Sequence, residues 1–204
     1  IMSSSVLAPA ATLDVAAQEL LFRDAHTAHA FTDQPVTDAE VAAIYDLVKW
    51  APTSMNTQPL RLVLVRSSAA RERLLTHMAE GNRAKTAQAP LVAVLAADVD
   101  FHEQLHKVVP NLPGAKDRFP DAAAREEFAR GQAWLQAGYT ILGIRALGLD
   151  VGPMTGFDAA GLDADLLAGT ALKSIVVVNI GHPGPGAHRP RNPRLEQADV
   201  VITL

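Results

Sequence analysis

The stretch Lys49-Trp-Ala-Pro-Thr-Ser-Met-Asn-Thr-Gln-Pro59, followed at once by Leu60-Arg-Leu-Val-Leu-Val65, decides how this chain folds. A helical pattern ends at its start, because Pro52 and Pro59 each disfavour helix in the preceding residue and fix their own φ. The branched apolar run after Pro59 predicts a buried strand. Amides and hydroxyls crowd the loop between the prolines, which indicates hydrogen bonding to a ligand, with an ordinary helix-to-strand turn as the alternative.

The composition limits the class of protein. The 204 residues are 49% hydrophobic with no break in composition, so residues 1–204 are expected to form a single domain. The chain lacks a run of about 18 apolar residues and a secretory signal, which predicts a cytoplasmic protein that does not enter a membrane. With no cysteine, thiolate chemistry and Cys-ligated metals are excluded, and a net charge of −4 argues against a nucleic-acid partner.

Helical and extended patterns alternate along the chain. Apolar residues recur at three- and four-residue spacing behind Thr37 or Asp38 as the N-cap and predict a helix over 38–50. Further helices are expected over residues 13–30, 67–79 and 121–147, and strands over 60–65, 91–97 and 174–180. These elements predict a sheet covered by helices.

The helix expected over 121–147 is apolar on nearly every face of its second half. Such a helix should be buried on all sides. Gly131, Gly138 and Gly143 interrupt it, and a glycine costs a helix about 1 kcal/mol relative to alanine, so they indicate close approach of another backbone. That backbone belongs either to the core of the same chain or to a second subunit, and both interpretations stay open.

A metallopeptidase pattern occurs in Phe101-His-Glu-Gln-Leu-His106. In zinc peptidases the two histidines of His-Glu-x-x-His lie one helical turn apart and bind the metal. Here Pro110 leaves barely two turns of helix and no third ligand follows. We therefore expect a solvated amphipathic turn and no metal site.

Cationic residues gather near the C-terminus, whereas the standard nucleotide-binding signatures are missing. In His188-Arg-Pro-Arg-Asn-Pro-Arg194 the prolines hold the chain extended, so that Arg189 and Arg191 point the same way. Two guanidinium groups at this spacing suit a phosphate, and a solvated basic tail is the alternative.

Four motifs in order resemble the FMN-dependent nitroreductase family. Residues 51–59 resemble its Ala-Pro-Ser-Ser-x-Asn-x-Gln-Pro loop, Gly81-Asn-Arg-Ala-Lys85 its Asn-x-x-Lys, and Gly152-Pro-Met-Thr-Gly-Phe-Asp158 its Pro-x-x-Gly-Phe segment; the arginine-proline tail completes the series. Within the family, the chain most resembles the malonic semialdehyde reductases of pyrimidine degradation, through residues 49–54, 81–86, 145–158 and 172–174.

The resemblance implies a fold and an assembly. The fold is α+β, a three-layer α/β/α sandwich with a mainly antiparallel central sheet. The assembly is a homodimer with two FMN sites at its interface and exchanged C-terminal segments, in which residues 199–204 add a strand to the partner's sheet.

The resemblance also implies roles for individual residues. The cofactor-binding residues it assigns are His26, Thr27, His29, Ser54, Asn56, Asn82, Lys85, Pro153, Thr155, Gly156, Arg189 and Arg191. Arg189 and Arg191 hold the phosphate together with the segment 26–29, Asn82 and Lys85 contact the pyrimidine edge of the flavin, and Pro153 packs on one ring face. The family usually carries two or three Arg or Lys residues in the N-terminal segment, whereas this chain has Ala25, His26 and His29, which predicts weaker or pH-sensitive flavin binding.

The activity implied is hydride transfer from NADH or NADPH to FMN N5 and then to an acceptor, with ping-pong kinetics. We expect a small aldehyde such as malonic semialdehyde, reduced to 3-hydroxypropionate, as the acceptor. Nitroaromatics or quinones are the alternative, and a flavin-binding homodimer without turnover is the alternative of a different class.

Overall fold

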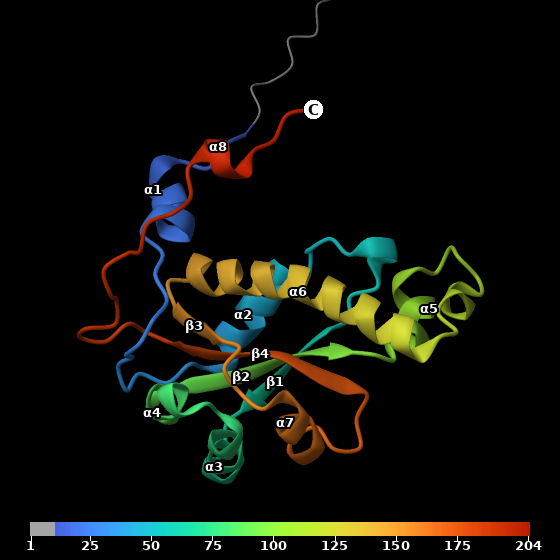
Figure 1. Ribbon diagram of the computed structural model, residues 1–204, viewed down its shortest axis with the longest axis horizontal. Coiled ribbons are helices and arrows are strands. Elements are labelled where there is room, and N and C mark those ends of the chain that lie inside the picture. Colours follow the sequence, from blue (N-terminus) through green and yellow to red (C-terminus); the bar gives the residue numbers. More distant parts are fainter. Residues whose placement is uncertain (1–10) are drawn as a thin grey trace, which may run out of the picture.

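The computed structural model describes residues 11–204. Four antiparallel strands form one sheet in the order β1-β2-β4-β3. Helices α2 and α6 cover one face of the sheet, and α3, α4 and α7 lie on the other (Figure 1). The expected α+β fold, a three-layer sandwich around an antiparallel sheet, is confirmed.

The bounds of the elements are as follows. The strands are β1 (Leu60–Val65), β2 (Leu91–Asp98), β3 (Asp150–Met154) and β4 (Leu172–Gly181). The helices are α1 (Val15–Gln18), α2 (Asp38–Val48), α3 (Ser68–His77), α4 (Glu80–Gln88), α5 (Leu105–Val108), α6 (Ala122–Ala146), α7 (Ala159–Asp165) and α8 (Gln197–Val200). Short 3₁₀ turns cover Ser54–Asn56, Phe101–Gln104 and Ala115–Arg118, and a π-helical turn covers Glu19–Arg23.

The core occupies both faces of the two central strands, β2 and β4. Successive side chains of a strand point to opposite faces, so Ala93 and Leu95 pack beneath α2 and α6 while Val92 and Val94 pack against α3 and α7. Every residue of β2 except the last is buried. The apolar runs that predicted these strands are therefore explained by burial on two sides.

One expectation about local structure is wrong, and one strand was missed. The helix expected over 13–30 ends at Arg23, and residues 25–29 run extended beside the sheet. Strand β3 was not expected, because Gly152 and Pro153 at its centre are typical of turns. Pro153 fits there since β3 pairs only with β4 and so lies at an edge of the sheet, where a residue without an N–H is tolerated.

The long helix α6 is half covered. A Cβ on Gly143 would lie 2.3 Å from Val48 Cγ1, so this glycine permits the close packing of α2 on α6 within the chain. On another face of α6, Trp134, Leu135 and Tyr139 are 45%, 45% and 42% exposed. Burial of this helix on all sides is therefore wrong for a single chain, and an apolar face of α6 is open.

Candidate cofactor site

The N-terminal segment 25–29 lies along the edge strand β3. Thr27 forms a parallel bridge with Val151, and the Ala28 N–H donates to the Val151 carbonyl at 3.1 Å. A Cβ on Gly152 would lie 2.7 Å from the Ala28 carbonyl oxygen, so glycine is required for this approach. The segment is thereby held as an additional partner of β3.

The C-terminal segment closes over the same residues. Arg191 Nη2 donates to the carbonyl oxygens of Arg23 at 2.6 Å and Ala25 at 2.9 Å, and the His29 N–H donates to the Ala187 carbonyl at 2.9 Å. These bonds join parts of the chain that are more than 150 residues apart in sequence. The site therefore depends on both ends of the described chain.

A cavity of about 630 Å³ lies between these two segments and the end of α6. It is lined by Ala25, His26, Thr27, His29, Arg145, Arg189, Pro190, Arg191, Asn192 and Arg194. The structure thus brings together His26, Thr27, His29, Arg189 and Arg191, all of which were expected at a phosphate. Arg145 was not expected there.

Positive charge dominates this cavity. Burial, and next the positive charge of Arg189, lowers the pKa of Lys85 on α4. Burial also lowers the pKa of His29, with smaller contributions from Arg189 and Lys85. Lys85 is therefore close enough to the cavity for its charge to act on it, and an anion placed among these groups would relieve their mutual repulsion.

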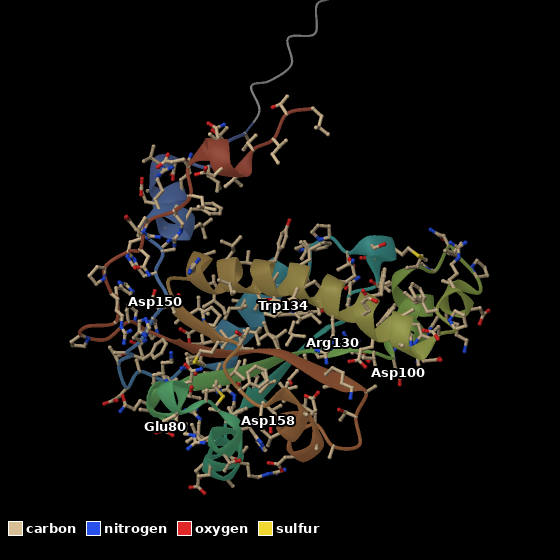
Figure 2. The ribbon with its side chains drawn as sticks, in the orientation of Figure 1. Glu80, Asp100, Arg130, Trp134, Asp150 and Asp158 are labelled. Carbon is tan, nitrogen blue, oxygen red and sulfur yellow. The ribbon has the colours of Figure 1, made fainter. Side chains whose placement is uncertain are left out.

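Asp150 is the carboxylate at this end of the sheet, and it is engaged by His188. His188 Nε2 contacts Asp150 Oδ2 in an ion-pair geometry, and the His26 ring stacks on His188 with ring centroids 5.0 Å apart. Figure 2 places Asp150 at the start of β3, where the terminal segments cross the sheet. The Asp150 carboxylate therefore already has a partner in His188.

A second wall forms at the other end of β3. Asn82 Nδ2 and the Ala79 N–H both donate to the Gly156 carbonyl oxygen, each at 3.0 Å. A Cβ on Gly156 would lie 2.7 Å from Asn82 Nδ2, so this contact requires glycine. Asn82 and Lys85 are three residues apart on α4 and share one helical face, as expected. Thr155 and Gly156 are exposed and Pro153 is half-buried.

Ser54 and Asn56 do not reach the cavity of their own chain. The Ser54 N–H donates to Gln132 Oε1 at 2.7 Å, and Asn56 Nδ2 donates to the Val108 carbonyl at 2.9 Å. Gln132 and the cavity residue Arg145 are 13 positions apart on α6, which is roughly 20 Å along the helix axis. The loop therefore lies against the middle of α6.

This loop also has an unusual backbone. Met55, Asn56 and Gln58 have φ values of 53°, 52° and 45°, in the left-handed region that L-residues other than glycine seldom adopt. Internal bonds hold it, since Thr57 Oγ1 donates to the Ser54 carbonyl at 3.0 Å and Gln58 Nε2 donates to Asn56 Oδ1 at 2.8 Å. Strain of this kind is typical of functional loops.

The His-Glu-x-x-His pattern does not form a continuous α-helix. A 3₁₀ turn over Phe101–Gln104 precedes α5, and His106 Nδ1 lies 2.9 Å from the Glu103 carbonyl oxygen. Among residues 11–204 there is no group of three or more His, Cys, Asp or Glu side chains placed to hold a metal ion. Within the same range, no helix is both long enough and apolar enough to span a bilayer.

Sequence reasoning missed Arg145 because it is a single cation at the end of an apolar helix. Its only signal was position, since an arginine in the last turn of such a helix is brought to the edge of the core. The pairing of His188 with Asp150 was missed for a different reason, as it joins residues 38 positions apart through the tertiary fold.

Comparisons with known proteins agree with this geometry. The model described as the nitroreductase family matches residues 23–182. A Streptomyces griseus protein provisionally named an NADH dehydrogenase/NAD(P)H nitroreductase is 57% identical over 193 residues, which cover 94% of this chain and 98% of that protein.

Solved structures show the same fold at low sequence identity. The crystal structure of ydfN from Bacillus subtilis, provisionally described as a nitroreductase, has a TM-score of 0.80 at 22% identity and covers 94% of this chain and 100% of that one. A provisionally named nitroreductase from Exiguobacterium sibiricum, solved in complex with FMN, has a TM-score of 0.78 at 18% identity, with coverages of 92% and 96%.

Proposed function

Since this chain belongs to the nitroreductase family, we propose that it is an FMN-dependent NAD(P)H oxidoreductase that reduces nitroaromatic or quinone acceptors with broad specificity. The observation that carries the proposal is the cationic cavity beside β3, with Lys85 and Asn82 on the neighbouring helix.

The residues present fit FMN in charge and in shape. Arg189, Arg191 and the segment 26–29 would hold the phosphate, because guanidinium groups and backbone N–H groups are the usual donors to phosphate oxygens. Residues 150–156 extend about 20 Å along the sheet edge, which provides room for the flavin ring beyond the phosphate. Glycine at 156 keeps the position beside Asn82, after the end of β3, clear of a side chain.

Bound FMN would supply the chemistry, taking a hydride from NADH or NADPH and passing it to the acceptor. The protein would contribute orientation and charge. Lys85 would stabilise negative charge that develops on the pyrimidine edge of the flavin, and its half-buried position strengthens that interaction. Asn82, fixed by its bond to the Gly156 carbonyl, would orient the same edge.

The name of the relative from Streptomyces griseus favours a nitro compound as acceptor over an aldehyde. The expectation of malonic semialdehyde depends on the likeness of residues 49–54, 81–86, 145–158 and 172–174 to the malonic semialdehyde reductases. No contact of the described residues distinguishes a small aldehyde from an aromatic acceptor. We therefore place nitroaromatics and quinones first and keep malonic semialdehyde as one acceptor to be assayed.

A homodimer is part of the proposal. Exposed apolar side chains gather on and beside α2 and α6, with Tyr45, Trp50 and Trp134 at 57%, 78% and 45% exposure (Figure 2 marks Trp134 on α6). The apolar strand β1 lies at the other edge of the sheet and pairs only with β2. A second copy packed on this face would cover both features.

The dimer would also give the polar loop a role. Ser54 and Asn56 lie beside α6, on the side of the chain where the apolar face is open, so they would reach the cofactor of the partner subunit and complete its site. Of residues 199–204, which were expected to add a strand to the partner's sheet, Asp199 and Val200 belong to the short helix α8, and 201–204 form no strand in the single chain. Their exposed Val201, Ile202 and Leu204 suit pairing with β1 of the partner.

The test is an anaerobic acceptor panel on protein loaded with FMN. NADH or NADPH should bleach the flavin absorbance, and a nitroaromatic, a quinone or malonic semialdehyde should restore it. Fast reoxidation by the first two with slow reoxidation by malonic semialdehyde is the expected result. Protein that binds FMN but is bleached by neither donor would instead be a flavin-binding homodimer without turnover.

A further inference from the structure

Arg145 is placed as a ligand-binding residue without a protein partner. It belongs to the last turn of α6, lines the cavity together with Arg189 and Arg191, and is half-buried. Among residues 11–204, no side-chain hydrogen bond and no ion pair within 4.0 Å involves its guanidinium group. Burial of a charged group without such partners costs free energy.

Charges of both signs act on Arg145 from within the chain. Burial is the largest influence and lowers the pKa of Arg145; the negative charge of Asp150 comes next and raises it, and the positive charge of Arg191 lowers it by less. Asp150, however, is already engaged by His188. A negatively charged ligand in the cavity would balance both arginines.

Two neighbouring arginines, unlike Arg145, form hydrogen bonds to backbone carbonyls. Arg191 uses Nη2 on the carbonyls of Arg23 and Ala25, and Arg194 uses Nη1 on the carbonyls of Asn192 and Pro193. Within the described residues, Arg145 has no such backbone bond. Its whole guanidinium fork is therefore available to a ligand.

We propose that Arg145 is a phosphate ligand in this cavity, supplying from the end of α6 the guanidinium that the N-terminal segment lacks at Ala25, His26 and His29. The proposal rests on the proposed function for the identity of the ligand, the phosphate monoester of FMN. A planar guanidinium can donate two parallel hydrogen bonds to such a phosphate, which a lysine ammonium cannot reproduce.

The experiment compares FMN with riboflavin, which lacks the phosphate, by titrating the apoprotein and following flavin fluorescence. Arg145→Gln should weaken FMN binding by about 10- to 100-fold and leave the riboflavin Kd within about twofold. The FMN affinity of Arg145→Lys should lie between that of Arg145→Gln and that of the unsubstituted protein. Arg118→Gln is the matched control, because Arg118 is an exposed arginine before the opposite end of α6 and should bind FMN like the unsubstituted protein.

Three results would overturn the proposal. The first is an unchanged FMN affinity in Arg145→Gln. The second is a fall in the riboflavin affinity of Arg145→Gln by the same factor as its FMN affinity. The third is an FMN affinity of Arg145→Lys equal to that of the unsubstituted protein. Circular dichroism and a thermal unfolding midpoint for each variant identify any that fail to fold, and Arg145→Lys then carries the comparison.

Inorganic phosphate separates failure of this proposal from failure of the proposed function. If the unsubstituted protein binds no FMN, the proposed function fails. Phosphate should still raise the unfolding midpoint of the unsubstituted protein and of Arg118→Gln, but not that of Arg145→Gln. Equal stabilisation of all three by phosphate would overturn the role of Arg145.

Discussion

Gly156→Ala tests the hydrogen bond from Asn82 to the Gly156 carbonyl, which lies at the end of the site away from the phosphate cavity. The added Cβ would lie 2.7 Å from Asn82 Nδ2, which is closer than non-bonded atoms approach, so one of the two groups must move. Asn82 is the group that can move, because Nδ2 is the end of a flexible side chain. Its 3.0 Å bond to the Gly156 carbonyl is then lost, whereas the Ala79 N–H still donates to that carbonyl.

The magnitude follows from the single bond that breaks. One hydrogen bond between uncharged groups contributes about 1 kcal/mol to stability, so Gly156→Ala and Asn82→Ala should each lower the free energy of unfolding by about that amount. The double variant should lose about as much as either single one, because both remove the same interaction. FMN affinity should fall in all three, since Asn82 no longer orients the ring.

Urea unfolding followed by circular dichroism gives the stabilities, and fluorescence titration gives the FMN affinities. Gly81→Ala is the matched control on the same helix α4, where an added Cβ meets no atom within 4 Å and the stability should be unchanged or up to about 1 kcal/mol higher. Additive losses in the double variant would refute the reasoning, as would Gly156→Ala with unchanged stability and FMN affinity.

Four further outcomes are expected. Arg191→Ala should weaken FMN about 10- to 100-fold in the same titration, and a Kd within twofold of the unsubstituted value would contradict its phosphate role. Burial is the main cause that lowers the pKa of His29 in the folded chain below its ordinary value of 6.5. Below that pH the unfolded chain therefore binds more protons than the folded one, so the free energy of unfolding should fall as the pH drops below 6.5. His29→Gln should flatten that fall in urea titrations between about pH 5 and 7, and an unchanged slope would show that His29 does not contribute to it. Gly152→Ala places a Cβ 2.7 Å from the Ala28 carbonyl, which is backbone and cannot swing aside, so roughly 1–3 kcal/mol of stability should be lost, and a neutral result would mean that the segment is not held there. Trp134→Glu should shift the sedimentation coefficient from dimer towards monomer with the circular dichroism unchanged, and an intact dimer would place the interface on another face.

The regular elements could be predicted where one local signal was sufficient. Thr37 caps α2 and exchanges hydrogen bonds with Glu40, and the apolar run of β2 has the burial expected on both faces. Strand β3 could not be predicted in this way, because Gly152 and Pro153 are typical of turns and adopt a strand here only through contacts with distant parts of the chain. Gly152 admits the N-terminal segment, and Pro153 lies on an edge.

The candidate site was predictable only in part, for a related reason. The family resemblance implied twelve cofactor-binding residues, and the fold brings five of them to one cavity: Arg189 and Arg191 from the four motifs, and His26, Thr27 and His29 from the N-terminal segment. Periodicity cannot show that Ser54 lies roughly 20 Å along α6 from that cavity, since this separation depends on how α6 packs. Nor can it show that Arg145 lacks a partner, which is a property of every chain segment around it.

The crossing of the two terminal segments at β3 sets the time at which the site can form. Arg191 leaves the ribosome after all four strands and α6, whereas Ala25, whose carbonyl it binds, leaves before them. The sheet and α6 can assemble while the residues after β4 are still being synthesised, but the phosphate cavity cannot. Retention of the cofactor would therefore mark a chain that has been synthesised at least as far as Arg191 and has folded around it, and removal of residues 23–29 or 187–194 should release the cofactor before the core unfolds.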